Sequence, residues 1–297
     1  MTDIIDSPAA EIAPVLTPPE VTFLRSLEQI AAGGPGPIMA IGGAEDKTRD
    51  RLILTAFHAL AGGLDARIAI VPTASSIENA GERYKALFLE MGAASAEVVY
   101  LADRADANRD SAVEILQDTT GIFITGGNQL RLASIVGGTL VARAVRERNL
   151  AGAVIAGTSA GASILSSHMV AFGSSGAAPK MRMAQMTAGF GLVHDTLVDQ
   201  HFRQRDRFGR LLALVAASPA LLGVGVDEDT AAIFRNDGTI EVLGRHTVTI
   251  VDGTHIESDV FRVKGHAPIT VANAIVHILA SGRRFDTHAR RLLNEDR

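Results

Sequence analysis

The chain contains no cysteine and no tryptophan, and only 2 of its 297 residues are tyrosine. The absence of cysteine excludes a disulfide scaffold, a thiolate metal site and a cysteine nucleophile. Because aromatic residues make up only 4% of the chain, the core must be aliphatic, and stacking platforms for nucleobases are not expected.

An excess of positive charge is also missing. Lys and Arg number 28 against 33 Asp and Glu, a formal net charge of −5, so nothing points to nucleic acid. No apolar run is long enough to span a membrane. Residues 1–20 carry acids and prolines and lack the basic and apolar regions of a signal peptide. We expect a cytoplasmic protein with neither nucleic-acid nor membrane partners.

Hydrophobic residues make up 47% of the chain, enough for a large α/β core. In the first half, short runs that are apolar throughout alternate with helical stretches. Such strands are buried on both faces, which indicates a mostly parallel sheet covered by helices. The sequence predicts strands at residues 38–41, 67–71, 97–100, 121–125 and 153–156, and helices at 49–60, 79–91, 111–117 and 130–148.

Composition divides the chain into three regions. Residues 1–36, punctuated by prolines, are expected as a tail that is partly disordered or forms one short helix. Residues 37–282 are expected as one catalytic α/β domain, and residues 283–297 as a helical tail on the surface. Late in the domain, strand-like runs flank a turn and predict a small, partly antiparallel sheet. These runs are residues 231–234, 239–243 and 247–251.

The letters GTSAG at residues 157–161 follow the apolar run AVIA and precede a run of small residues. This pattern predicts strand, sharp turn and helix with Ser159 at the turn, as in a nucleophile elbow. Its hydroxyl would stand at a helix N-terminus, where free N–H groups favour developing negative charge. A plain glycine- and alanine-rich connection would give the same letters, so partners for Ser159 must be found.

A catalytic serine needs a base, usually a histidine that a carboxylate holds in one tautomer. Of nine histidines, His194 and His201 remain once those in helices, C-terminal strands and tail are set aside. His201 ends a strand among polar residues, so we expect it to be the base; a loop histidine that caps a helix is the alternative. The acid should follow the strand at residues 222–226, where three carboxylates remain open. They are Asp227, Glu228 and Asp229.

Two glycines, Gly126 and Gly127, follow the strand at residues 121–125. Because they have no side chains, the backbone there can approach a substrate closely. The N–H groups of Gly127 and Ala160 are therefore the expected oxyanion hole, with a simple strand-to-helix turn as the alternative. The chain has no dinucleotide or P-loop fingerprint, and no H-E-x-x-H spacing supports a metal on Asp199, His201 and Glu228. We expect neither cofactor nor metal.

Arginines crowd the stretch that follows His201. A charge cluster is ordinarily a solvated face, but guanidinium groups beside a catalytic rim suit planar carboxylates. Asp199, Glu45 and Asp46 offer the opposite sign for a cationic group. The rim therefore suits a zwitterionic substrate. The arginines are Arg203, Arg205, Arg207 and Arg210.

Six motifs, in the same order, together resemble the cyanophycinases. One such motif would be weak, but six in register between residues 38 and 235 are highly specific. They are IGGAEDK at 41–47, PTASS at 72–76, TGGNQLR at 125–131, GTSAGA at 157–162, DQHF at 199–202 with the arginines that follow, and DEDTA at 227–231.

This resemblance implies a flavodoxin-like, class I glutamine amidotransferase-like fold and a homodimer. It implies a serine exopeptidase that hydrolyses cyanophycin, multi-L-arginyl-poly-L-aspartate, to β-Asp-Arg dipeptides through an acyl-enzyme. The family's catalytic residues fall on Ser159, His201 and Glu228, which favours Glu228 over its neighbours. Substrate-binding positions fall on Gln129, Asp199, Gln200, Arg205, Arg207 and Arg210.

Two other functions stay open at this point. One is an aspartyl dipeptidase of the same family, acting on small peptides. The other is an inactive homologue that binds the polymer, although the serine, histidine and glutamate are all present.

Overall fold

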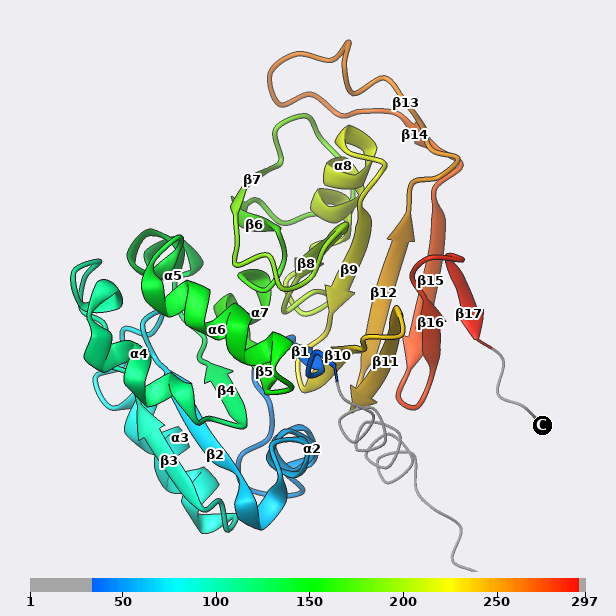
Figure 1. Cartoon of the computed structure of the whole chain (residues 1–297). Helices are drawn as coiled ribbons and strands as arrows, with labels where there is room; N and C mark the ends of the chain where they lie inside the picture. The colour runs from blue at the N-terminus through cyan, green and yellow to red at the C-terminus, as the bar shows by residue number, and fades with distance from the viewer. Residues whose placement is uncertain (1–33, 294–297) are drawn as a thin grey trace, which may run out of the picture.

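The computed structural model describes residues 34–293, so most of the expected N-terminal tail lies outside the described residues. Two sheets form the framework (Figure 1). From one edge to the other, the nine-stranded sheet consists of β17 (Arg291–Leu293), β16 (Arg284–Asp286), β11 (Thr239–Gly244), β10 (Thr230–Phe234), β1 (Ile38–Ile41), β5 (Val154–Thr158), β4 (Gly121–Ile124), β2 (Arg67–Val71) and β3 (Ser95–Val98).

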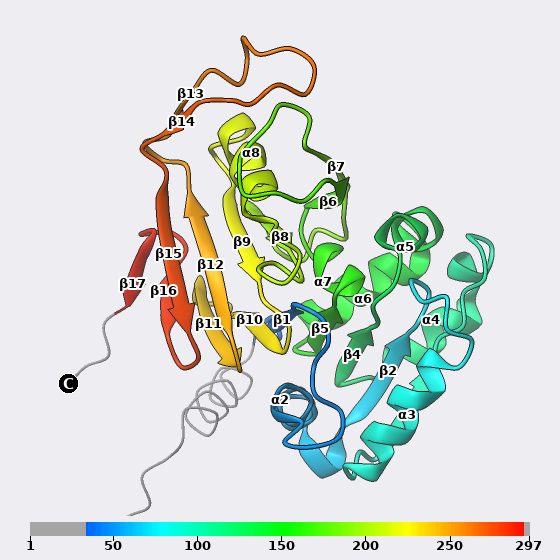
Figure 2. The ribbon, with the colours of Figure 1, turned by 180° about the vertical axis from the view of Figure 1, so that it is seen from behind.

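The five strands from β1 to β3 in this order run parallel, which confirms the predicted parallel sheet. Helices cover both of its faces, as Figures 1 and 2 show from opposite sides. Apolar residues of α2 (Leu52–Leu60) and α3 (Ala80–Glu90) pack on one face. Those of α4 (Asp110–Gln117), α5 (Gln129–Val136) and α6 (Leu140–Leu150) pack on the other.

The single helix expected at residues 130–148 is two helices in the structure. α5 ends at Val136 and α6 begins at Leu140. Gly138 lies between them with φ +71°, a conformation that glycine adopts at little cost, and the Thr139 side chain accepts from the N–H of Ala142 to cap α6.

The predicted small, partly antiparallel sheet is present but has a different membership. It contains β15 (Ile275–Ala280), β12 (Thr247–Asp252), β9 (Leu222–Val226) and β8 (Thr196–Asp199), in that order. β8 and β9 are parallel, and the other neighbours are antiparallel. The runs expected beside β12, now β10 and β11, extend the larger sheet instead. All five residues of β10 are buried, so this strand needs cover on both faces.

The helix expected at residues 283–297 is wrong for the part that is described. Residues 284–286 and 291–293 are strands β16 and β17, which extend the larger sheet beyond the expected boundary at residue 282. Phe285 is fully buried and lies opposite Ile240 of β11. Hydrogen bonding to the open backbone edge of β11 and burial of the Phe285 ring stabilise a strand here. Together they outweigh the helical preference of the surrounding polar residues.

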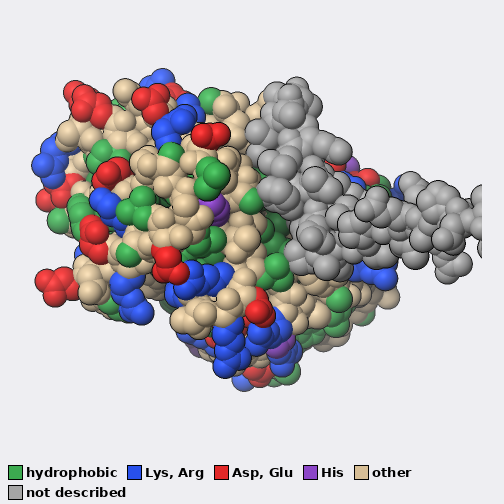
Figure 3. All heavy atoms as spheres, turned by 90° about the horizontal axis from the view of Figure 1, so that it is seen from below, with side chains coloured by type: hydrophobic (Ala, Val, Ile, Leu, Met, Phe, Trp, Pro, Cys, Tyr) green, Lys and Arg blue, Asp and Glu red, His purple; other side chains and the backbone are tan. Residues whose placement is uncertain are grey.

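Shorter elements complete the fold around the strand ends. No described helix is long and apolar enough to cross a membrane. On the face in Figure 3, basic and acidic side chains are interspersed. The remaining elements are α7 (Ala160–Ser163), α8 (Phe208–Ala217), β6 (His168–Gly173), β7 (Ala184–Ala188), β13 (Glu257–Ser258), β14 (Val271–Ala272), and the 3₁₀ turns η1 (Gly63–Asp65) and η2 (Asp106–Asn108).

Phe123 of β4 is the centre of a buried aromatic cluster. Its ring centroid lies 5.4 Å from those of Phe57 and Phe88 and 4.6 Å from that of Tyr84. Phe123→Ala would leave a cavity between these rings, so we expect urea denaturation to show a loss of about 3–5 kcal/mol in the free energy of unfolding. Leu64→Ala, at a side chain 78% exposed, should change it by less than about 0.5 kcal/mol. Equal losses would contradict this account of the core.

Candidate active site

Ser159 occupies a strained turn between β5 and α7. Its backbone has φ +54° and ψ −113°, a combination that residues with side chains rarely adopt. The turn closes because the flanking glycines allow backbones to touch. A Cβ at Gly157 would lie 2.1 Å from the carbonyl oxygen of Gly161, and one at Gly161 would lie 2.3 Å from that of Ile124. The GTSAG letters therefore fold as a tight elbow with the serine at its apex.

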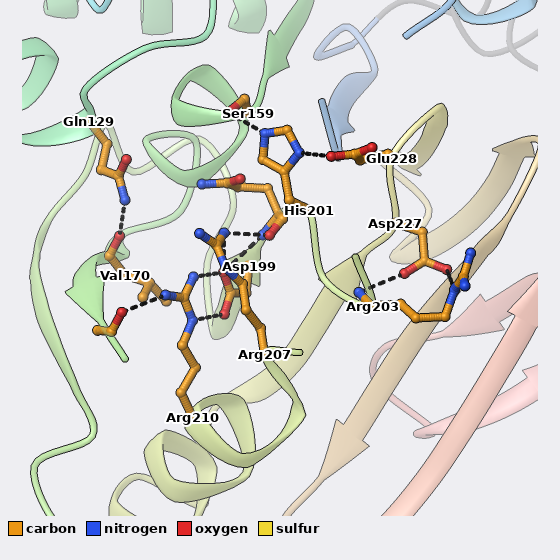
Figure 4. Close-up of polar contacts among 12 residues, drawn as sticks. Gln129, Ser159, Val170, Asp199, His201, Arg203, Arg207, Arg210, Asp227 and Glu228 are labelled. Atoms are coloured by element: carbon orange, nitrogen blue, oxygen red, sulfur yellow. Dashed lines mark hydrogen bonds and ion pairs between the residues drawn. The ribbon is translucent and has the colours of Figure 1, made fainter. Parts of the chain in front are cut away.

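Loops that leave the second sheet bring a histidine and a carboxylate to this serine (Figure 4). Ser159 Oγ lies 2.9 Å from Nε2 of His201, and Nδ1 of His201 lies 2.6 Å from Oε1 of Glu228. His201 follows β8, and its N–H donates to the carbonyl oxygen of Gly42, which follows β1. Glu228 follows β9. The structure thus brings together the three residues on which the resemblance placed the catalytic roles.

The two carboxylates beside Glu228 are engaged elsewhere. Asp227 is buried and accepts from the backbone N–H of Arg203 and from Thr247. Asp229 accepts from the N–H of Asp46. Of the three acids that their order in the chain left open, Glu228 is therefore the one whose carboxylate contacts His201.

Burial is the main influence on the His201 imidazole. It lowers the pKa of His201 below its usual 6.5, while the hydrogen bond and charge of Glu228 raise it and nearby Arg205 and Arg207 lower it. At neutral pH the ring is therefore neutral, and its Nε2 is able to accept the proton of Ser159. Glu228 fixes the tautomer in which Nδ1 carries the hydrogen.

Two backbone N–H groups beside Ser159 have no acceptor within the described part of the chain. They belong to Gly127, at the end of β4, and to Ala160, the first residue of α7. A Cβ at Gly126 would lie 3.6 Å from Ser159 Oγ, which shows how closely this loop approaches the serine. Gly127 has φ +145°, and a Cβ there would lie 1.9 Å from the carbonyl oxygen of Ala74. This geometry suits donors for an oxyanion.

A buried ion cluster lies beside the serine (Figure 4). Both carboxylate oxygens of Asp199 accept from Arg210, Nε of which lies 2.6 Å from Oδ2. Arg207 donates to the carbonyl oxygen of Gln200, and its Nη1 lies 3.5 Å from Asp199. All four residues are buried. Burial lowers the pKa of Arg207 to about 10, so the guanidinium remains charged at neutral pH.

Two polar atoms of this cluster lack a partner among the described residues. They are Oε1 of Gln200 and Nε of Arg207. Buried polar atoms nearly always have a hydrogen-bond partner, so these two mark a place where water or a ligand is expected. Gln129 lies apart from this cluster in Figure 4 and donates to the carbonyl oxygen of Val170 at 3.3 Å.

The other two arginines of the crowded stretch differ in surroundings. Arg205 is exposed and close enough to His201 to lower its pKa. Arg203 is held instead by Asp227, whose Oδ2 lies 3.5 Å from Nε, and it contacts His246. Arg203 is therefore part of the surface next to the second sheet.

The acids Glu45 and Asp46, which the sequence offered as partners for a cation, are both occupied. Glu45 is buried and accepts from Thr158 at 2.5 Å, from Tyr84, and from Lys47 at 2.9 Å. Asp46 accepts from the N–H groups of residues 48–51, which hold its pKa well below its usual range. Tyr84 was missed by sequence reasoning, because a tyrosine inside a helix carries no sign of a partner 39 residues away.

Among residues 34–293, no group of three or more His, Asp or Glu side chains is placed to hold a metal ion. What the site does hold is a serine on a strained elbow, within hydrogen-bond reach of a histidine that a carboxylate orients. On a flavodoxin-like α/β fold, this is the arrangement of a serine hydrolase.

The chain belongs to peptidase family S51, whose sequence profile matches residues 38–243. The cyanophycinase of Nostoc sp. is 43% identical over 260 residues, which cover 86% of this chain and 87% of that protein. The cyanophycinase of Synechococcus elongatus is 42% identical over 254 residues, 84% of this chain and 79% of that one. The resemblance found in the six motifs is thus confirmed.

A solved structure shows the same fold at lower identity. The crystal structure of a peptidase from an acI-B1 Actinobacterium is 24% identical, with a TM-score of 0.58, and the match covers 83% of this chain and 100% of that chain. At this identity the likeness is one of fold.

Asp199 is expected to be essential for stability as well as for the site. Asp199→Asn would leave the buried guanidinium groups of Arg207 and Arg210 without their counter-charge, at a cost of about 3–5 kcal/mol in the free energy of unfolding. Urea denaturation measures this loss. Glu147→Gln, which breaks an exposed pair with Arg143, should cost no more than about 0.5 kcal/mol. A neutral Asp199→Asn variant would show that the cluster does not need the charge.

Proposed function

We propose that this protein is a serine exopeptidase that hydrolyses cyanophycin to β-Asp-Arg dipeptides through an acyl-enzyme. One observation carries the proposal. The hydrogen-bonded series Ser159, His201 and Glu228 stands at the strand ends of a chain 43% identical to proteins named cyanophycinase. An inactive homologue would have no need to retain this geometry.

The reaction follows from the positions of these atoms. His201 Nε2 takes the proton of Ser159 as Oγ attacks a carbonyl carbon of the polymer, and Glu228 stabilises the resulting imidazolium. The N–H groups of Gly127 and Ala160 hold the oxyanion, and each such donor lowers the barrier by about 2.7–4 kcal/mol. Collapse expels the leaving amine, which receives the proton from His201. A water molecule, activated by the same histidine, then releases the acyl group.

Substrate recognition is proposed to use both signs of charge. In cyanophycin each arginine is linked through its amino group, so its carboxylate and its guanidinium both remain free. We propose that the substrate carboxylate is bound by Arg205, Arg207 and Arg210. The amide groups of the substrate are proposed to bind Gln129 and Gln200. The unpartnered atoms Gln200 Oε1 and Arg207 Nε are consistent with this. Asp199 is assigned here to hold the arginines, because both its oxygens are already occupied.

We further propose that cleavage is exo-acting, as the resemblance to the cyanophycinases implies. By resemblance to the cyanophycinases we also propose a homodimer that works in the cytoplasm.

The direct test is Ser159→Ala. Without the nucleophile, release of β-Asp-Arg from purified cyanophycin should fall by about 10⁶-fold, as measured by mass analysis of the products. Ser111→Ala, at an exposed serine on α4, is the matched control and should retain full activity. Undiminished release by the folded Ser159→Ala protein would refute the serine mechanism. Faster turnover of Asp-X dipeptides than of the polymer would instead support the aspartyl dipeptidase.

The pH dependence tests the role of His201. Because only the neutral imidazole accepts a proton and its pKa lies below 6.5, kcat/KM should stay high near pH 7 and decline only below pH 6.5. Glu228→Gln removes the hydrogen bond and the charge that raise this pKa, so the decline should move to still lower pH. The rate at neutral pH should fall by up to about 10⁴-fold, since the tautomer is no longer fixed. A decline that moves to higher pH would contradict the assignment.

A further inference from the structure

Ser159 also faces a space that no residue of the buried ion cluster lines. It is a cavity of about 660 Å³ between the loop after β1 and helix α3. Its walls include Ser159 and Gly126, whereas Asp199, Arg207 and Gln129 do not line it. The nucleophile therefore lines a cavity from which the buried ion cluster is absent, and a polymer cleaved at Ser159 must extend to both sides of the serine.

The deep wall of this cavity is polar, and its charge is already balanced. Glu45 is buried there, and its two oxygens accept from Thr158, Tyr84 and the Lys47 ammonium group. Lys47 also lies over the Tyr84 ring, 5.4 Å from its centroid. Burial raises the pKa of Tyr84, so its hydroxyl keeps the proton that it donates to Glu45. With these groups satisfied by one another, Glu45 is a fixed part of the wall.

The outer wall carries one positive charge that is not balanced. Arg51 lies 2.9 Å from Glu90, so these two charges cancel. Arg83, an exposed residue on the first turn of α3, lines the cavity, and within residues 34–293 its guanidinium makes no ion pair or hydrogen bond. The apolar residues Ile77 and Leu87 line the same cavity. A carboxylate on a short aliphatic stem fits this combination.

We propose that this cavity, which we call the Arg83 pocket, holds the polymer unit on the opposite side of the scissile bond from the unit bound beside Arg207 and Arg210. Arg83 binds the arginine carboxylate of that unit, and the apolar wall packs against its methylene groups. This inference rests on the proposed function. It makes Arg83 a specificity residue. Arg83 favours a substrate of at least two β-Asp-Arg units over an aspartyl dipeptide whose second residue is uncharged.

The first test is the variant Arg83→Gln assayed on the two-unit substrate, (β-Asp-Arg)₂. Loss of a charge-assisted contact made equally in the ground and transition states should raise KM about tenfold and leave kcat nearly unchanged. Lys85→Gln is the matched control. Lys85 lies on the same helix, pairs with Glu97 at 3.1 Å and does not line the cavity, so its KM should not change.

The second test identifies the group that Arg83 contacts. In two isomers of the two-unit substrate, agmatine replaces arginine in one unit or the other, which removes one carboxylate and keeps the guanidinium. For one isomer, kcat/KM of the wild type should be about tenfold lower than for (β-Asp-Arg)₂. The Arg83→Gln variant should cleave that isomer as fast as the wild type does. For the other isomer, the loss caused by the missing carboxylate and the loss caused by Arg83→Gln should multiply, because residues other than Arg83 hold the carboxylate that this isomer lacks.

The outcomes separate this inference from the proposed function. If the wild type cleaves (β-Asp-Arg)₂ and Arg83→Gln has the same KM, the Arg83 pocket is refuted and the proposed function stands. Losses that multiply for both isomers would also refute it, because Arg83 would then contact neither carboxylate. If the wild type cleaves neither the polymer nor the two-unit substrate, the proposed function fails, and this inference fails with it.

Discussion

The hydrogen-bonded series from Ser159 through His201 to Glu228 links the two sheets of the molecule, and the site depends on this link. Ser159 leaves β5 of the larger sheet, whereas His201 and Glu228 leave β8 and β9 of the smaller one. The 2.9 Å contact between Ser159 and His201 crosses from one sheet to the other, so it persists only if the two sheets are rigidly docked. One continuous aliphatic core, which includes Ile155 and Val226, provides that docking.

The end of β1 holds both Ser159 and His201 in place. The N–H of Ser159 donates to the carbonyl oxygen of Ile41, and that of His201 donates to the carbonyl oxygen of Gly42. At Gly43, with φ +98°, a Cβ would lie 2.4 Å from Cε1 of His201. The end of the first strand thus positions residues 118 and 159 places further along the chain, and glycine is required where the imidazole packs against its loop.

Charge is distributed around the serine in two different ways. On one side, Asp199, Arg207 and Arg210 are buried together and neutralise one another in part, which keeps the guanidinium groups fixed. On the other side, Glu45 is saturated by the protein and Arg83 has no ion-pair partner in the described chain. Each side combines fixed acids with an available cation, and this suits a polymer in which every unit carries both signs.

The sequence by itself determined the parallel strands, the elbow at Ser159 and the loop at Gly127, because these features depend on apolar runs and on glycines a few residues apart. It also placed His201 at a strand end. The tertiary structure decided what depends on distant contacts: that β10, β11 and β16 join the larger sheet, that Asp227 turns away from His201, and that Arg83 lines the same cavity as Ser159. The physical reason is that the direction of a side chain is set by packing partners far away in the chain, which local patterns do not encode.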